Sequence, residues 1–310
     1  MQVFKTTDSS ISKYVHNDGS ETTIKTQDFN SGAKNKFSVF LSSSVGCPIG
    51  CKFCYLSDKS KFKYKKLSTE SILNNAREAI EAEVIDKPEL RKKYIKISWM
   101  GMGDALLIRP VDFKVLNEQL VDWTISDAGY AWGLDGIDVS TILPDVHRGW
   151  PHQLSNLNDL CNYKYRLNPN NKDKSPLRLF YSMNFTEKRH DHIPTRDADD
   201  PGWDLEFLGS ISDWYGIDVI LHHLFLNGVN DTPEDIINLK DVLYGVRPIS
   251  ELRILRYNKY PGSSYEESKK FDSIVESLQR DVGSKVRCQV SLGSEIKSAC
   301  GMFMTEEDLT

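Results

Sequence analysis

The sequence lacks the features that would place it in a membrane or outside the cell. No segment approaches the roughly 18 uninterrupted apolar residues that a transmembrane helix needs. The polar first residues contain no apolar run of signal-peptide length. The six cysteines do not have the spacing of a disulfide framework. We therefore expect a cytoplasmic protein with no membrane partner, in a reducing compartment.

Strong charge of one sign and internal repetition are also missing. The formal net charge is −5, so a local basic face would have to bind any RNA. We find no internal repeat and no low-complexity linker. A hydrophobic fraction of 39% and a charged fraction of 27% are ordinary for a globular protein. The 310 residues suffice for one large α/β domain, or for such a domain with a small extension.

Half of the cysteines stand close together, as Cys47, Cys51 and Cys54 in a C-x3-C-x2-C pattern. Three thiolates on one tight loop can bind three irons of a [4Fe–4S] cluster and leave the fourth iron open to a small molecule. A structural zinc site would need four ligands, usually in two pairs. The remaining cysteines, which form no second pair, are Cys161, Cys288 and Cys300. The spacing is typical of radical S-adenosylmethionine (SAM) enzymes, and the alternatives are a zinc site or incidental buried thiols.

Short β-rich runs alternate with helical patterns from position 37 onward. The expected strands are 37–42, 94–100, 136–140, 177–183, 218–225 and 251–257, with a last strand at 285–291. The expected helices between them are 71–82, 113–123, 152–162, 203–215, 233–243 and 265–280. Residues 186–202 are highly charged and contain two prolines, which predicts a long surface loop. Six strand–helix units predict an α/β fold, a partial (β/α)6 radical-SAM barrel.

Two further segments flank this barrel. Residues 12–15 and 21–26 surround Asn17-Asp18-Gly19, a turn sequence that predicts a β-hairpin. We therefore expect an N-terminal β-hairpin extension over 1–36, the barrel over 37–293 and a C-terminal tail over 294–310 that carries Cys300.

Polar residues and glycines follow several predicted strands, where parallel barrels place their chemistry. Gly103 and Asp104 follow the second strand, in Gly-Met-Gly-Asp at 101–104. The glycines allow a ligand to approach the backbone, and the carboxylate could hold the amino group of SAM. The other polar residues at this edge are Ser140, Ser182, Asn184 and Asn258. They could cap helices or satisfy turns, but their common position favours contacts to SAM.

Residues 52–66 contain six lysines, one acid and four aromatic residues. Basic residues mixed with aromatics beside an active site suit phosphate contacts and base stacking. A solvated lysine-rich loop explains the same composition equally well.

Taken together, these motifs resemble the RlmN/Cfr family of radical-SAM RNA methyltransferases. The segments that match the family's motifs are 43–46, 101–106, 140–141, 182–184, 226–231, 258–262 and 299–301. The likeness runs from Lys13 to Met304, which is nearly the whole chain.

The resemblance implies a mechanism, cofactors and partners. One SAM would methylate Cys300, and a second SAM on the open iron would yield a 5′-deoxyadenosyl radical that activates the S-methyl group. The resulting carbon radical would add to C2 or C8 of an adenine, and Glu21, which matches the family's general base, would take the proton. The implied partners are RNA (rRNA or tRNA) and an external reductant such as flavodoxin or ferredoxin, and we expect a monomer.

The chain departs from the family at three points. Seven residues before the first cluster cysteine, the family has a second cysteine that resolves the intermediate, whereas this chain has Phe40. Cys288 or Cys161 could substitute, an external thiol could act, or the reaction could end differently. The family's N-terminal helical domain has no counterpart here, and Asp104-Ala105 and Asn184 replace Glu-Pro and His. Because of the first two departures, an alternative function stays open, that of a radical-SAM enzyme that acts on a nucleotide, peptide or small molecule.

Overall fold

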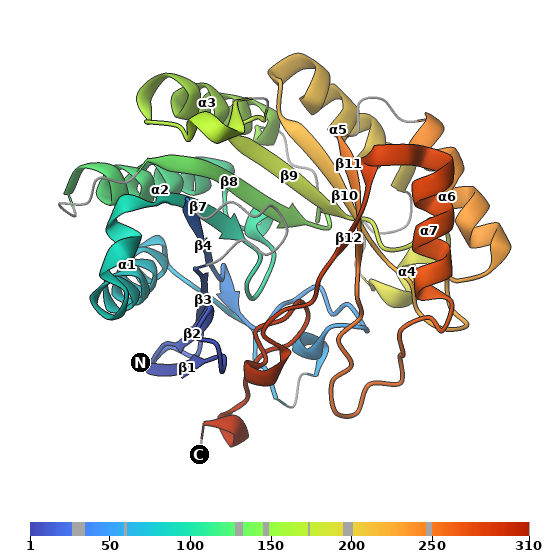
Figure 1. Ribbon diagram of the computed structural model, residues 1–310, viewed down its shortest axis with the longest axis horizontal. Helices are drawn as coiled ribbons and strands as arrows, with labels where there is room; N and C mark the ends of the chain where they lie inside the picture. The colour runs from blue at the N-terminus through green and yellow to red at the C-terminus, as the bar shows by residue number, and fades with distance from the viewer. Residues whose placement is uncertain are drawn as a thin grey trace.

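The computed structural model describes residues 1–26, 35–58, 61–127, 133–144, 149–172, 174–194, 201–245 and 250–309. In this part of the chain, one sheet has ten strands and a second has two, and the helices form an outer layer (Figure 1). No described helix has the length and apolar character needed to cross a bilayer.

Parallel strands make up most of the large sheet. They are β4 (Lys36–Phe40), β7 (Tyr94–Trp99), β8 (Leu134–Thr141), β9 (Leu177–Ser182), β10 (Asp218–Leu224), β11 (Glu251–Leu255) and β12 (Val286–Gln289). Each pairs in parallel with the next, in chain order. These strands match the predicted runs, so the prediction of a partial (β/α)6 barrel is confirmed, with β12 added at one edge.

The outer layer follows the predicted helices. Its helices are α1 (Thr69–Asp86), α2 (Pro110–Asp122), α3 (Trp150–Lys164), α5 (Pro201–Tyr215), α6 (Pro233–Gly245) and α7 (Phe271–Val282). The short α4 (Arg189–His192) was not predicted. The largest boundary error concerns α7, which was predicted to begin at 265. Before it, Glu267 pairs with Arg256 at 2.7 Å and the Ser268 hydroxyl donates to Asp231 at 2.6 Å. These long-range bonds hold the segment in a non-helical conformation.

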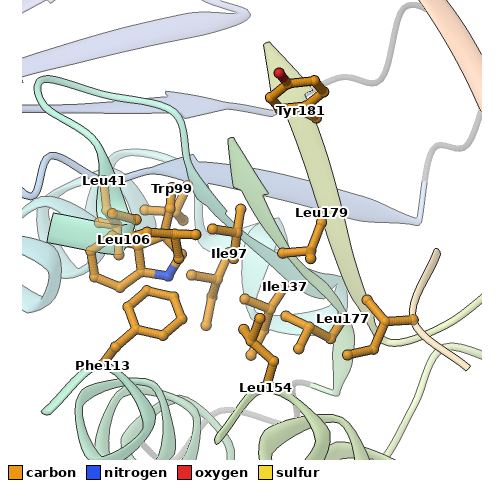
Figure 2. Close-up of a cluster of buried hydrophobic side chains, with 14 of the residues drawn as sticks. Leu41, Ile97, Trp99, Leu106, Phe113, Ile137, Leu154, Leu177, Leu179 and Tyr181 are labelled. Atoms are coloured by element: carbon orange, nitrogen blue, oxygen red, sulfur yellow. The ribbon is translucent and has the colours of Figure 1, made fainter. Parts of the chain in front are cut away.

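The two faces of the barrel strands differ in chemistry. Figure 2 shows apolar side chains of the sheet against those of α2 and α3, among them Ile97, Trp99, Ile137, Leu177, Leu179, Phe113 and Leu154. Burial of each such side chain contributes about 1.5–3 kcal/mol. The alternate positions carry charge: Lys96 Nζ and the Arg178 guanidinium both lie 2.5 Å from Asp138. The helices therefore cover the apolar face, and the inner face is left polar.

An antiparallel extension continues the sheet beyond β4. It consists of β1 (Gln2–Lys5), β2 (Ile11–Val15) and β3 (Glu21–Lys25), and β3 pairs with β4 so that Thr23 lies opposite Phe40. Gly19 in the turn has a φ of 87°, which glycine adopts without strain. The predicted hairpin is confirmed, whereas β1 was not predicted. The small second sheet joins β5 (Ser44–Val45) to β6 (Lys65–Lys66).

The prediction of a surface loop over 186–202 is wrong for its first half, and 195–200 lie outside the described residues. The segment contains α4, whose Arg189 is 1% exposed. Its guanidinium donates to the carbonyls of Met183 at 3.1 Å and Ile142 at 3.2 Å. Carbonyl groups just beyond two neighbouring strands thus draw this charged side chain inward.

Candidate active site

One cavity of about 230 Å³ collects all the residues that the sequence indicated as functional. They are Glu21, Cys47, Cys51, Cys54, Gly103, Asp104, Ser140, Ser182, Asn184, Asn258 and Cys300. The cavity lies where the parallel strands end, because Ser140 is the second-last residue of β8 and Ser182 is the last residue of β9. The hairpin adds Glu21 from one side, and the C-terminal segment adds Cys300 from another.

The cysteine loop is shaped by two glycines in the left-handed conformation, Gly46 (φ 63°) and Gly50 (φ 77°). Both bends turn the short loop so that its three thiols border one cavity. Burial raises the pKa of Cys47 to about 11 and that of Cys54 to about 12. The unligated thiols are therefore protonated near neutral pH, and metal binding would release protons.

These three cysteines fit an iron–sulfur cluster better than a single metal ion. Among the described residues, no three His, Cys, Asp or Glu side chains converge as a single ion requires. A four-iron cluster does not need that convergence, because each thiolate binds a different iron. The donor set, three soft thiols on one cavity wall, suits iron–sulfur ligation.

The turn after β7 brings the chain close to the loop that leads to the cysteines. Gly103 has a φ of 85°, and a Cβ there would lie 2.2 Å from the Ser44 hydroxyl oxygen. The two carboxylate oxygens of Asp104 accept amide hydrogen bonds from Leu106 and Ile142, each at 2.9 Å. Burial raises the pKa of Asp104 to about 6, against the effect of these amides. Asp104 therefore fastens its own loop to the end of β8 as well as bordering the cavity.

Asn184 differs from the other rim residues because its side-chain oxygen has no partner. The residue is 3% exposed and has a φ of 58°. Its backbone amide donates to the His222 carbonyl at 3.2 Å, and its backbone carbonyl accepts from the Asn230 side-chain amide at 2.9 Å. The buried Oδ1 makes no hydrogen bond in the structure. A buried acceptor beside a cavity is available to a donor group of a ligand or of a water molecule.

Cys300 is exposed where it borders the cavity, and its backbone is held in place. The Asn258 side-chain amide donates to the Cys300 carbonyl at 3.0 Å. The Tyr55 amide, next to a predicted cluster ligand, donates to the Gly301 carbonyl at 3.1 Å. Surrounding protein atoms raise the pKa of Cys300, and Lys25 opposes that rise. Asn258, predicted as a contact to SAM, is thus engaged in positioning the Cys300 segment.

Glu21 lies in the same cavity and is 4% exposed. Burial raises the pKa of Glu21, and the ammonium group of Lys13 at 2.7 Å opposes the rise. A carboxylate with a raised pKa is a better proton acceptor near neutral pH. The sequence interpretation did not include Lys13. Its signal was a lysine within a strand whose first and last residues, Ile11 and Val15, are both apolar.

The position of the family's resolving cysteine also faces this cavity. Phe40 borders it, and the Lys25 ammonium lies 5.0 Å from the centre of its ring. Neither alternative thiol borders the cavity: Cys161 is fully buried in the core on α3, and Cys288 lies on β12 next to the lining residue Gln289. The structure thus does not support a substitute thiol from this chain.

The lysine-rich stretch divides into a buried and an exposed part. Tyr55 and Phe62 pack into a small core, whereas Tyr64 is 48% exposed. Lys61 pairs with Glu307 at 2.5 Å, and Lys59 lies outside the described residues. The exposed lysines of the stretch are Lys52, Lys63, Lys65 and Lys66. Base stacking by several aromatics is therefore not supported, but a basic surface beside the cysteine loop remains.

No family model matches the chain. The dual-specificity RNA methyltransferase RlmN of Bdellovibrio bacteriovorus is 25% identical over 291 residues, covering 89% of this chain and 61% of that protein. The protein of the same name from Syntrophobacter fumaroxidans is 26% identical over 281 residues, covering 86% and 69%. The chain is similar to these RlmN proteins over most of its length.

Solved structures agree with this similarity at the level of the fold. A radical SAM methyltransferase from Sphaerobacter thermophilus superposes with a TM-score of 0.69 at 20% identity, covering 97% of this chain and 80% of that one. The chain spans 61% of the length of its Bdellovibrio relative. Its fold is that of radical SAM methyltransferases.

Proposed function

We propose that the chain is a radical-SAM enzyme that binds a [4Fe–4S] cluster and SAM, and that methylates an adenosine in RNA at C2 or C8 through S-methylated Cys300. One observation carries the proposal: the three loop cysteines, Cys300 and Glu21 border a single cavity. The relatives named as RNA methyltransferases support RNA as the substrate. An external reductant such as flavodoxin or ferredoxin, and a monomeric state, belong to the same proposal.

The chain's own residues bind, orient and move a proton in this reaction. Cys47, Cys51 and Cys54 would hold the cluster, which with SAM supplies the methyl group and the hydrogen-abstracting radical chemistry. Asn258 holds the backbone of Cys300 where this residue borders the cavity. Glu21 takes the proton that leaves the adenine carbon.

The side-chain oxygen of Asn184 is proposed to accept a hydrogen bond from bound SAM. Asn184→Gly removes the side chain but leaves the left-handed backbone unstrained. Loss of one such bond at a buried acceptor is expected to weaken SAM binding about tenfold. Equilibrium binding to the reconstituted, cluster-containing protein measures this, with iron content as the control. Unchanged SAM affinity at unchanged iron content would contradict the role.

An RNA adduct tests the proposed substrate. Because neither Cys161 nor Cys288 borders the cavity, a covalent bond between Cys300 and RNA is expected to accumulate with SAM and reductant. We would incubate the anaerobically reconstituted enzyme with total cellular RNA, then digest it and analyse the Cys300 peptide by mass spectrometry. Cys300→Ser is the matched control and is expected to form no adduct.

Phe40→Cys places a thiol at the family's position, on the wall of the same cavity. It is expected to lower the adduct and raise the yield of released methyladenosine at least about tenfold. The new thiolate can attack the Cys300 sulfur and form a disulfide, while the bond from that sulfur to the adduct carbon breaks and the carbon takes up a proton to become the methyl group. Absence of an adduct in the wild type and of methyladenosine in Phe40→Cys would favour the alternative function, that of a radical-SAM enzyme acting on a nucleotide, peptide or small molecule.

A further inference from the structure

Lys13 forms a buried ion pair with Glu21, and both residues border the cavity that Cys300 also borders. Lys13 on β2 and Glu21 on the adjacent strand β3 are 1% and 4% exposed. The ammonium nitrogen lies 2.7 Å from Glu21 Oε2 and 5.8 Å from the centre of the Phe303 ring. Burial of two charges is costly, and it is compensated only when each charge is paired and hydrogen-bonded.

Both groups of the pair are also bonded to the C-terminal segment. The Met304 amide donates to Glu21 Oε1 at 2.7 Å, across 283 positions of sequence. The Lys13 ammonium donates to the carbonyl of Lys297. Cys300 lies between these two attachment points. The hairpin is therefore hydrogen-bonded to the C-terminal segment both before and after Cys300 in the sequence.

The charges around Glu21 determine its protonation. Lys13 faces it from β2, and Lys297 and Asp308 approach from the C-terminal segment, where they pair with each other. Burial favours the neutral carboxyl group, and the ammonium of Lys13 is the main charge that favours the carboxylate. Without that ammonium, a higher pH would be needed to ionise Glu21.

We propose that Lys13 is a positioning residue, which keeps Glu21 ionised and fastens it to the segment that presents Cys300. The inference rests on the proposed function, in which the adenine C–H bond breaks, its electron pair stays with the adenine adduct, and the proton goes to a Glu21 oxygen. Lys13 thus couples the base to the methyl-carrying thiol. It acts through these two groups and not on the substrate itself.

Three substitutions separate the charge from the hydrogen bond. Lys13→Met removes both, Lys13→Gln keeps a donor for the Lys297 carbonyl without the charge, and Lys13→Arg keeps both. Lys5→Met is the matched control, because Lys5 forms an exposed ion pair with Asp86 at 2.8 Å, away from the cavity.

The first measurement is the pH dependence of the single-turnover rate at which the RNA adduct loses its adenine C2 or C8 hydrogen. In Lys13→Met and Lys13→Gln, the acid limb of the pH–rate profile is expected to move to a pH about one unit higher, because Glu21 needs a higher pH to ionise. Lys13→Arg and Lys5→Met are expected to keep the wild-type limb. A merely structural role would lower the rate at every pH and leave the limb where it is. If Lys13→Met does not fold, Lys13→Gln supplies this result.

The second measurement is amide hydrogen exchange over 297–304, which requires no RNA. Exchange is expected to be about tenfold faster in Lys13→Met than in the wild type and unchanged in Lys5→Met. An unmoved acid limb in Lys13→Gln together with unchanged exchange in Lys13→Met would overturn the inference. A wild-type enzyme that modifies no RNA would instead overturn the proposed function and the coupling to the base, and the exchange measurement alone would then decide whether Lys13 fastens the segment.

Discussion

Replacement of Cys51 with alanine is expected to remove the cluster and to abolish the cleavage of SAM. Cys51 is the middle ligand of the short loop, and two remaining thiolates cannot hold three irons. We expect iron content to fall to background and 5′-deoxyadenosine formation to fall at least about 1000-fold, because the cofactor supplies the difficult chemistry. Iron analysis and chromatography of the anaerobic reaction measure these effects.

Cys288→Ala is the matched control for this experiment. Cys288 is a half-buried cysteine on β12 that does not border the cavity. Its loss should leave iron content and 5′-deoxyadenosine formation within about twofold of wild type, as expected for a small change outside the site. Wild-type iron content in Cys51→Ala would show that a different set of ligands binds the iron.

The second large effect is expected from Cys300→Ala, which should abolish methyl transfer while the cluster remains. The contacts that hold this segment reach backbone carbonyls, those of Cys300 and Gly301, so the alanine variant keeps them. The methyl group then has no sulfur to bind. With SAM labelled in its methyl group, transfer to protein and RNA should fall at least about 1000-fold.

Cys300→Ser is the conservative companion, since the hydroxyl is a far weaker nucleophile than the thiolate. Both variants should contain as much iron as the wild type. Transfer of the label to RNA by Cys300→Ala would refute the methyl-carrier role. Loss of iron in either variant would instead indicate that Cys300 takes part in cluster binding.

The barrel was predictable because its signals are local and repeated. Each parallel strand has a short β-rich run, and each crossover has a helical pattern of suitable length. The predictions were wrong where distant groups override the local pattern. The start of α7 is displaced by the bonds of Glu267 and Ser268 to residues of earlier segments. Arg189, in a charged stretch, is buried by carbonyls beyond the ends of two strands.

In the candidate site too, features encoded within a short segment were predictable, and features that depend on distant residues were not. Cys47, Cys51 and Cys54 were identifiable because one loop contains the whole motif, and spacing within a loop is a property of sequence. The engagement of Asn258 with the Cys300 carbonyl spans 42 positions, and no local pattern encodes it. The absence of Cys161 and Cys288 from the cavity wall was likewise invisible, because it depends on which way each element faces.

The sequence by itself therefore determined the barrel, the cysteine loop and the candidate residues, since period, spacing and strand ends are written along the chain. Only the tertiary structure decided how these residues act on one another. It places Phe40 on the cavity that Cys300 also borders, and it joins Glu21 to Lys13 and to Met304. The physical reason is that hydrogen bonds and ion pairs depend on distance in space, and folding sets that distance independently of separation in the chain.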